Sequence, residues 1–380
     1  MDAPRLVRAV TAYTARTLPD LLRLGPATTA LAPWMLTALV APAASGEDRE
    51  AIEDALGLEA DEASQEVGRL LSGGPAALRA AVATWRSNLL ATDGDLGRWE
   101  ASIPEGAARG PIPSQADADE WTRLQTLGLI DRFPLQLDAD TLCVLAAAIA
   151  TRVTWTWPLD VIAAPTNAWG VGRMLAADVR GVVDTPVGLV GVAEADSSDR
   201  LTVYSFIADR GVELDEIATT ALRLLSDWYL ERREPEWIPA DKLGAEGHAW
   251  TVSIGHGGGD ALVPAFEERS NGADISGLAG IRDAAAILGR LALEAAPAQA
   301  RRVAVDAAMS AMARYDRRGF EAAAVATMLA PASISMARPV LTLHFDRPHL
   351  VVAVSTDEAY AGLPLFEAWV GAGVREPEGE

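Results

Sequence analysis

The residue types that most often carry out chemistry are scarce in this 380-residue chain. Its histidines are His248, His256, His344 and His349, and none of them has the spacing of a zinc ligand set. His344 and His349 stand in strand-like sequence, where a packed histidine is the expected role. The single cysteine, Cys143, cannot form an internal disulfide and does not suggest a metal cluster. We therefore expect neither a metal site nor a cofactor.

The glycine-rich stretch IGHGGGD (254–260) looks like a phosphate-binding loop but lacks the Gly-Lys-Ser/Thr ending that would hold phosphate and magnesium. The only lysine, Lys242, lies in a polar turn and is expected to be solvated. The sequence contains neither a G-x-S-x-G elbow nor an S-x-x-K pair. These observations argue against an enzyme.

The formal net charge is −21, which repels phosphate backbones and anionic lipid surfaces. Nucleic acid and membranes are therefore not expected as partners, and no apolar run approaches the roughly 20 residues of a bilayer span. The first 20 residues lack an apolar secretion core, which favours a cytoplasmic location. Arginine supplies all basic residues but one, and with abundant alanine and glycine this suggests a GC-rich bacterial source.

The chemistry-bearing residues must be positioned by elements that read as helices early and strands late. Helical patterns are expected near residues 6–24, broken or kinked by Pro19, and at 34–40, 45–57, 59–72, 117–128, 213–234 and 278–300. Strands are expected at 200–208, 248–255, 339–345, 349–355 and 363–370. The segment 141–155 reads as a buried strand with a helix as the alternative, and 303–316 fits either. With no clear linker, this pattern predicts one large α+β domain over residues 1–380.

The segment 317–354, RRGFEAAAVATMLAPASISMARPVLTLHFDRPHLVVAV, resembles the reactive-loop region of the serpin family. In that family a glycine, a small residue, a glutamate and a run of alanines form a hinge before an exposed bait loop. An aromatic residue, a short turn and a proline then open the next strand, as Phe345 and Pro348 do here.

Further similarities follow in the family's order along the chain. They include a tryptophan-containing helix and a central strand that ends in Trp155, Pro158 and Leu159. The matching segments are 30–58, 119–133, 142–159, 206–214, 273–280 and 363–370. The resemblance implies a serpin fold with an N-terminal helical part, mixed β-sheets and a reactive loop at about 317–338. It also implies a monomer that binds a serine protease and leaves an extracellular location open.

Serpins act by inserting the cleaved loop as an extra strand in a sheet, so the inserted face should carry small, uncharged side chains. Side chains alternate between the two faces of a strand. Phe320, Ala322, Ala324 and Ala326 share one face, and Glu321, Ala323, Val325 and Thr327 share the other. The hinge Gly319–Ala326 therefore has the pattern of a half-buried strand. An alanine-rich helix is the alternative, but Gly319 before the run and Pro331 within it favour the strand.

Two features depart from the family's pattern. Phe320 is larger than the usual residue, and its burial would overpack the sheet by roughly 1–3 kcal/mol. Arg317 and Arg318 replace acidic residues. In serpins a cluster of polar side chains holds the main sheet closed. The positions of this chain that match that cluster are all apolar: Ala32, Met35, Ala147 and Met309.

A standard loop length counted from Gly319 places the reactive bond at Ser333–Ile334, and one extra residue of bulge would move it toward Met336. Small flanking residues suit an elastase-like or subtilisin-like protease. Arg338 is followed by Pro339, which argues against a trypsin-like site. We therefore expect a protease inhibitor. A non-inhibitory serpin-fold binding or scaffold protein is the alternative, and an enzyme built on the fold is a third possibility.

Overall fold

The computed structural model describes residues 3–138, 141–164, 167–243, 249–255, 259–296, 307–320 and 338–377. The chain forms two compact units. Unit 1 contains Met1–Ala150, Ser270–Met312 and Leu363–Leu365, and unit 2 contains Thr151–Arg269, Ala313–Gly362 and Phe366–Glu380.

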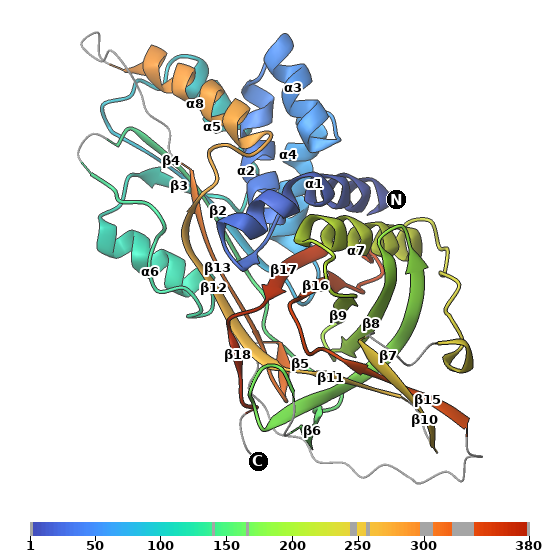
Figure 1. Ribbon diagram of the computed structural model, residues 1–380. Helices are drawn as coiled ribbons and strands as arrows, with labels where there is room; N and C mark the ends of the chain where they lie inside the picture. The colour runs from blue at the N-terminus through green and yellow to red at the C-terminus, as the bar shows by residue number, and fades with distance from the viewer. Residues whose placement is uncertain are drawn as a thin grey trace. The chain divides into compact units, whose positions relative to one another are not determined.

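All but one of the α-helices described belong to unit 1 (Figure 1). The exception is α7. The helices are α1 (Ala3–Leu24), α2 (Leu31–Val40), α3 (Glu47–Leu56), α4 (Ala60–Gly73), α5 (Asp95–Ser102), α6 (Gln115–Gln125), α7 (Leu214–Tyr229) and α8 (Ile281–Ala295), with short 3₁₀ turns at Ala41–Ala43 and Ala240–Lys242.

The strands fall into three sheets, and several run from one unit into the other. They are β1 (Ala27–Thr28), β2 (Arg79–Arg86), β3 (Ala108–Pro111), β4 (Cys143–Ala150), β5 (Val153–Thr154), β6 (Asp160–Ala163), β7 (Arg173–Thr185), β8 (Gly188–Asp196), β9 (Leu201–Ala208), β10 (Trp250–Gly255), β11 (Asp260–Val263), β12 (Ala265–Asp274), β13 (Ala308–Tyr315), β14 (Gly319–Phe320), β15 (Arg338–His344), β16 (His349–Ser355), β17 (Pro364–Val370) and β18 (Val374–Arg375).

The sequence predicted a break or a kink at Pro19, and the structure excludes the break, because α1 continues through Pro19 to Leu24. An internal proline costs a helix about 3 kcal/mol, but this helix buries a long apolar face that includes Val10, Tyr13 and Leu21. The Tyr13 hydroxyl also donates to the carbonyl of Ala279 in the same unit. Tertiary burial therefore outweighs the local cost of the proline.

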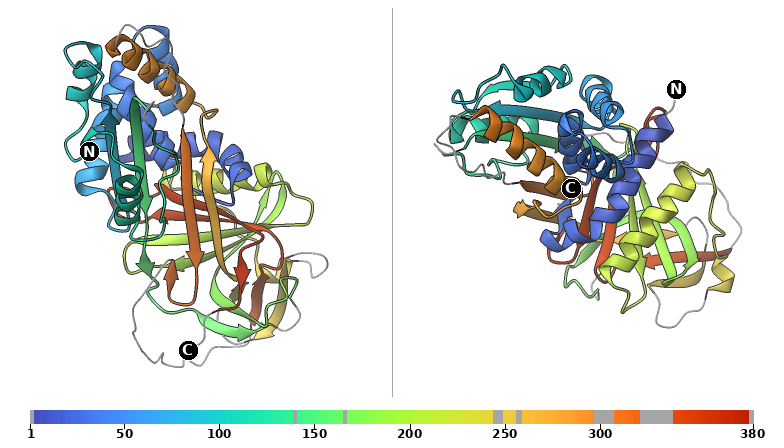
Figure 2. Two further views of the ribbon diagram at one scale, coloured as in Figure 1. Left: turned by 90° about the vertical axis from the view of Figure 1, so that its left-hand side faces the viewer. Right: turned by 90° about the horizontal axis from the view of Figure 1, so that it is seen from above.

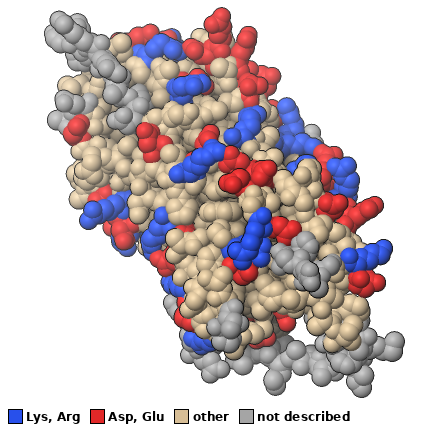
Figure 3. All heavy atoms as spheres, viewed as in Figure 1, with Lys and Arg blue, Asp and Glu red and all other residues tan. Residues whose placement is uncertain are grey.

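Unit 1 contains a three-stranded sheet in the order β3-β2-β4. The helix α6 packs on this sheet, where Ala118 joins Trp85, Phe133, Val144 and Ala146 in one buried cluster. The helix α3 carries acidic residues in its first turn, where the helix dipole favours them. Figure 3 shows acidic side chains gathered on this part of the surface.

The largest sheet, whose strands lie mostly in unit 2, has the order β1-β17-β16-β9-β8-β7-β11-β15-β10, with β6 beside β7. The helix α7 packs against β9 and β16, and it begins with a capping box between Glu213 and Glu216. A second sheet has the order β18-β12-β13-β14-β5. Figure 2 shows β12 and β13 running side by side.

The two segments that the sequence left ambiguous are both strands, β4 and β13. Along β13 the side chains of Met309, Ala311, Ala313 and Tyr315 are buried with the period of two that a strand has, and Met312 is the one buried side chain on the other face. The expected α+β fold class is confirmed. The sequence analysis did not identify β2, β7, β8 or β12.

Candidate functional site

The hinge begins inside a sheet. Gly319 and Phe320 form β14, which lies between β13 and β5. Phe320 pairs with Tyr315 on one side and with Val153 on the other, and both pairings are antiparallel. Its side chain is only 3% exposed. Neighbouring strands are about 4.8 Å apart, so β13 and β5 are separated by the width of one strand and β14 fills that place.

A tight turn at residues 316–319 reverses the chain from β13 into β14. The buried Asp316 accepts hydrogen bonds through its Oδ1 from the N–H groups of Arg318 (2.8 Å) and Gly319 (3.3 Å). The N–H of Asp316 donates to the carbonyl of Gly319 at 3.1 Å. This carboxylate therefore fixes the direction in which the hinge leaves β13.

Trp155, which the sequence analysis assigned to the end of the central strand, holds the same turn. Its Nε1 donates to the carbonyl of Asp316 at 2.8 Å, and its backbone N–H donates to the carbonyl of Arg318 at 3.0 Å. The backbone N–H of Leu159 reaches the carbonyl of Arg317 at 2.8 Å. Three bonds from this segment thus anchor the residues that precede Gly319.

Tyr315 and Phe266 provide the packing beside the turn. The two rings are stacked, with centroids 5.7 Å apart and planes 13° apart, and Trp155 packs against Tyr315 at 5.0 Å. Burial raises the pKa of the Tyr315 hydroxyl well above its usual range. The hinge therefore starts from a rigid aromatic support.

The edge of β4 is the second relevant feature. Within the described ranges β4 pairs with β2 alone and ends its sheet. Two residues after β4 the chain enters β5, which borders β14. The three-stranded sheet therefore has an edge on the strand that leads directly to the hinge.

The four positions matched to the sheet-closing cluster all lie in unit 1. Ala32 and Met35 are buried on α2, which packs against β4. Met309 is buried on β13, and Ala147 is half-buried on β4. The exposed fractions of Ala32, Met35 and Met309 are 7% or less. Their surroundings thus accept apolar side chains at these positions.

The reactive bond Ser333–Ile334, Met336 and the hinge positions 321–326 lie outside the described residues. The chain resumes at Arg338 in β15, which lies between β10 and β11. His248 and His256 are also outside the described ranges.

The described residues contain no group of three or more His, Cys, Asp or Glu side chains that could hold a metal ion. Burial raises the pKa of the Cys143 thiol to about 12, aided by Glu100. His349 is buried between aromatic rings, and burial lowers its pKa to about 4. In the described part of the chain no helix is both long and apolar enough to cross a bilayer.

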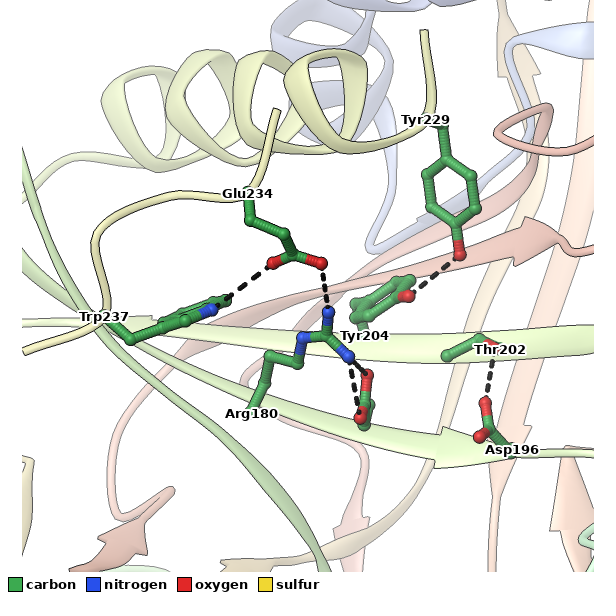
Figure 4. Close-up of polar contacts among 8 residues, drawn as sticks. Arg180, Asp196, Thr202, Tyr204, Tyr229, Glu234 and Trp237 are labelled. Atoms are coloured by element: carbon green, nitrogen blue, oxygen red, sulfur yellow. Dashed lines mark hydrogen bonds and ion pairs between the residues drawn. The ribbon is translucent and has the colours of Figure 1, made fainter. Parts of the chain in front are cut away.

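The sequence analysis missed a polar and aromatic cluster in unit 2, around Arg180 on β7 (Figure 4). The register between β7 and β8 shifts between Val179 and Gly181, so Arg180 is the extra residue of a β-bulge. Its guanidinium lies 2.7 Å from a carboxylate oxygen of Glu234 and 3.4 Å from one of Glu194. Burial opposes the charge on Arg180, but these carboxylates raise its pKa overall.

Two tryptophans flank this guanidinium. The Arg180 carbon Cζ lies 5.8 Å from the ring centroid of Trp228 and 5.9 Å from that of Trp237. The Trp237 ring lies against Gly181, where a Cβ atom would approach it to 2.5 Å. The cluster therefore holds the segment after α7 on the bulged strand. The one local signal for the bulge is the glycine within the strand, Gly181.

No protein-family model and no curated protein sequence matches the chain significantly. The structure is similar to the native thermophilic serpin tengpin, with TM-score 0.67, 13% identity and coverage of 96% of this chain and 93% of tengpin.

Two further structures show the same similarity. The native stressed conformation of Arabidopsis AtSerpin1 has TM-score 0.65, 16% identity and coverage of 97% of this chain and 98% of that one. Human thyroxine-binding globulin complexed with its hormone has TM-score 0.62, 14% identity and coverage of 98% of both chains. Since these similarities cover nearly the whole chain, the protein has the serpin fold.

Proposed function

We propose that the protein inhibits a serine protease by inserting its cleaved reactive loop between β13 and the β4–β5 strand segment. One observation carries this proposal: β14 already occupies the first two positions of that strand place. The open edge of β4 in the described sheet supports a longer insertion.

Continuing the β13–β14 register gives the expected partners of the inserted strand. Phe320 pairs with Tyr315, so Glu321 would face Arg314 and Ala326 would face Met309. Directly opposite charges stabilise an antiparallel pair. Residues opposite one another share a face, so Phe320, Ala322, Ala324 and Ala326 would join the buried face of β13. Their apolar side chains fit that environment.

The chemical step proceeds at the proposed bond Ser333–Ile334. The protease serine Oγ attacks the carbonyl carbon of Ser333, and the amide bond to the Ile334 nitrogen breaks. That nitrogen leaves with a proton as a free amine, and Ser333 remains as an ester on the protease. After cleavage the loop is joined to the protein only through Phe320 at the end of β14. It is therefore free to insert as a strand.

Phe320 is buried in β14 and paired with Val153, which is the position expected for the first residues of an inserted strand. The expected overpacking by its ring stays a prediction. The apolar positions Ala32, Met35, Ala147 and Met309 leave no polar group of their own to be separated when the strands move apart.

A non-inhibitory binding or scaffold protein is the second candidate. The hormone complex of thyroxine-binding globulin has the same fold, and Arg317, Arg318 and the apolar cluster depart from the inhibitory pattern. An enzyme built on the fold is the third. Serine proteases remain the proposed partners, with elastase-like and subtilisin-like enzymes first. A monomer and a cytoplasmic location remain predictions.

The test is incubation with subtilisin or pancreatic elastase, followed by denaturing electrophoresis. An inhibitor yields an SDS-stable complex. Ala324→Glu should abolish the complex and leave cleavage, because this side chain would enter the buried face. Ala323→Glu is the matched control and should retain the complex, because its side chain would point outward. Cleavage of the native chain without a complex would refute the proposal.

A further inference from the structure

The tip of the β10–β15 ribbon carries an apolar surface that extends from the core into solvent. Trp250 and Leu343 pair across the ribbon and are almost fully buried. The next pair on the same face, Val252 and Leu341, is half-buried. The pair at the tip is Ile254 and Pro339, and Ile254 is 73% exposed.

Nothing in the described part of the chain pairs with the outer edge of β10, which ends its sheet (Figure 1). From Thr251 to Gly255 this strand has no charged residue and no proline, the features that usually protect an exposed edge. An exposed edge without these features can take up another chain, and here Ile254 continues the apolar row formed with Val252, Pro339 and Leu341 rather than standing alone.

We infer that Val252, Ile254, Pro339 and Leu341 form a docking surface for the protease that cleaves the reactive loop. We call this set the ribbon face. The inference rests on the proposed inhibitory function, but its test measures protease docking separately from formation of the trapped complex.

The occupant follows from where the loop ends. Arg338 pairs with Gly255, the residue after Ile254. The proposed bond at Ser333 is five residues before Arg338, and five extended residues span at most about 18 Å. A protease–inhibitor interface buries about 800 Å² on each partner. A protease holding Ser333 is therefore close enough to contact the ribbon face.

The chemistry of the ribbon face also defines the contact. Because its four side chains are uncharged, the contact should be apolar and insensitive to salt. Contacts with the acidic surface elsewhere should weaken at high ionic strength. The complementary partner is an apolar rim beside the protease cleft.

The experiment measures the second-order rate of loop cleavage by subtilisin for the native chain and for Ile254→Thr. This rate is defined whether or not a stable complex forms. Threonine keeps the β-branched shape but loses apolar area, so we expect a roughly tenfold fall that persists at 0.5 M salt. Ile254→Val should restore the rate to within about twofold of native, and Ser253→Ala on the opposite face should leave it unchanged.

The outcomes separate the two proposals. A native chain that is cleaved without trapping refutes inhibition, yet a slower cleavage of Ile254→Thr would still support docking. An unchanged rate in Ile254→Thr overturns the docking proposal. A faster rate also overturns it, since the ribbon face would then be covering the loop. The docking proposal is also overturned if sedimentation shows that the native chain is a dimer and that Ile254→Thr is a monomer, because a second copy of the chain would then occupy the ribbon face.

Discussion

Replacing Phe320 by alanine tests whether the hinge is truly part of the sheet. The ring is 3% exposed and its backbone pairs with both Tyr315 and Val153. Truncating a buried phenylalanine costs roughly 3–5 kcal/mol through lost burial and the cavity left behind. Because β14 has only two residues and can partly relax, we expect a loss of about 3 kcal/mol in the free energy of unfolding.

Urea unfolding followed by tryptophan fluorescence measures this change, since Trp155 lies beside the turn. Arg318→Ala is the matched control: this side chain is exposed, and the carbonyl that accepts from Trp155 is retained. The control should change stability by no more than about 0.5 kcal/mol. If Phe320→Ala costs less than about 1 kcal/mol, the hinge is not held in the sheet and the reasoning about insertion fails.

Three further predictions concern buried polar groups. The pKa of His349 is about 4 in the folded protein and 6.5 in the unfolded chain, so the unfolded chain binds more protons between these values. We therefore expect the free energy of unfolding to fall by about 3 kcal/mol as the pH is lowered from 6.5 to 4. Urea unfolding across this range should show a weaker pH dependence of stability for His349→Gln. The Glu268 Oε1 accepts from three backbone N–H groups at residues 371–373, so Glu268→Ala should lower the unfolding free energy by roughly 3 kcal/mol, and Glu268→Gln by less because it keeps one acceptor. Arg180→Met leaves the half-buried Glu194 without its nearest cation and should cost about 1–2 kcal/mol at pH 7.5; since burial already raises the pKa of Glu194, this deficit should shrink as pH falls and Glu194 is protonated.

The reach of sequence reasoning differs between the fold and the site. The ordered similarities to serpins predicted the fold, and the spacing of apolar residues predicted most helices and the closing strands. Strands such as β7 and β8 were not predicted, because their mixture of small and polar residues gives no clear alternation. The apolar face of the hinge was readable from its spacing, although its outcome beyond Phe320 is still a prediction.

By itself, the amino-acid sequence indicated which side chains along a strand share a face, which segments are helical and, through its ordered similarities to serpins, which fold the chain adopts. Only the tertiary structure decided that Gly319 and Phe320 already lie between β13 and β5, and that Trp155 bonds to a carbonyl 161 residues away. The physical reason is that every residue offers the same backbone donor and acceptor, so local spacing cannot specify which distant strand becomes the partner. The bulge at Arg180 and the exposed edge of β10 likewise arise from non-local pairing.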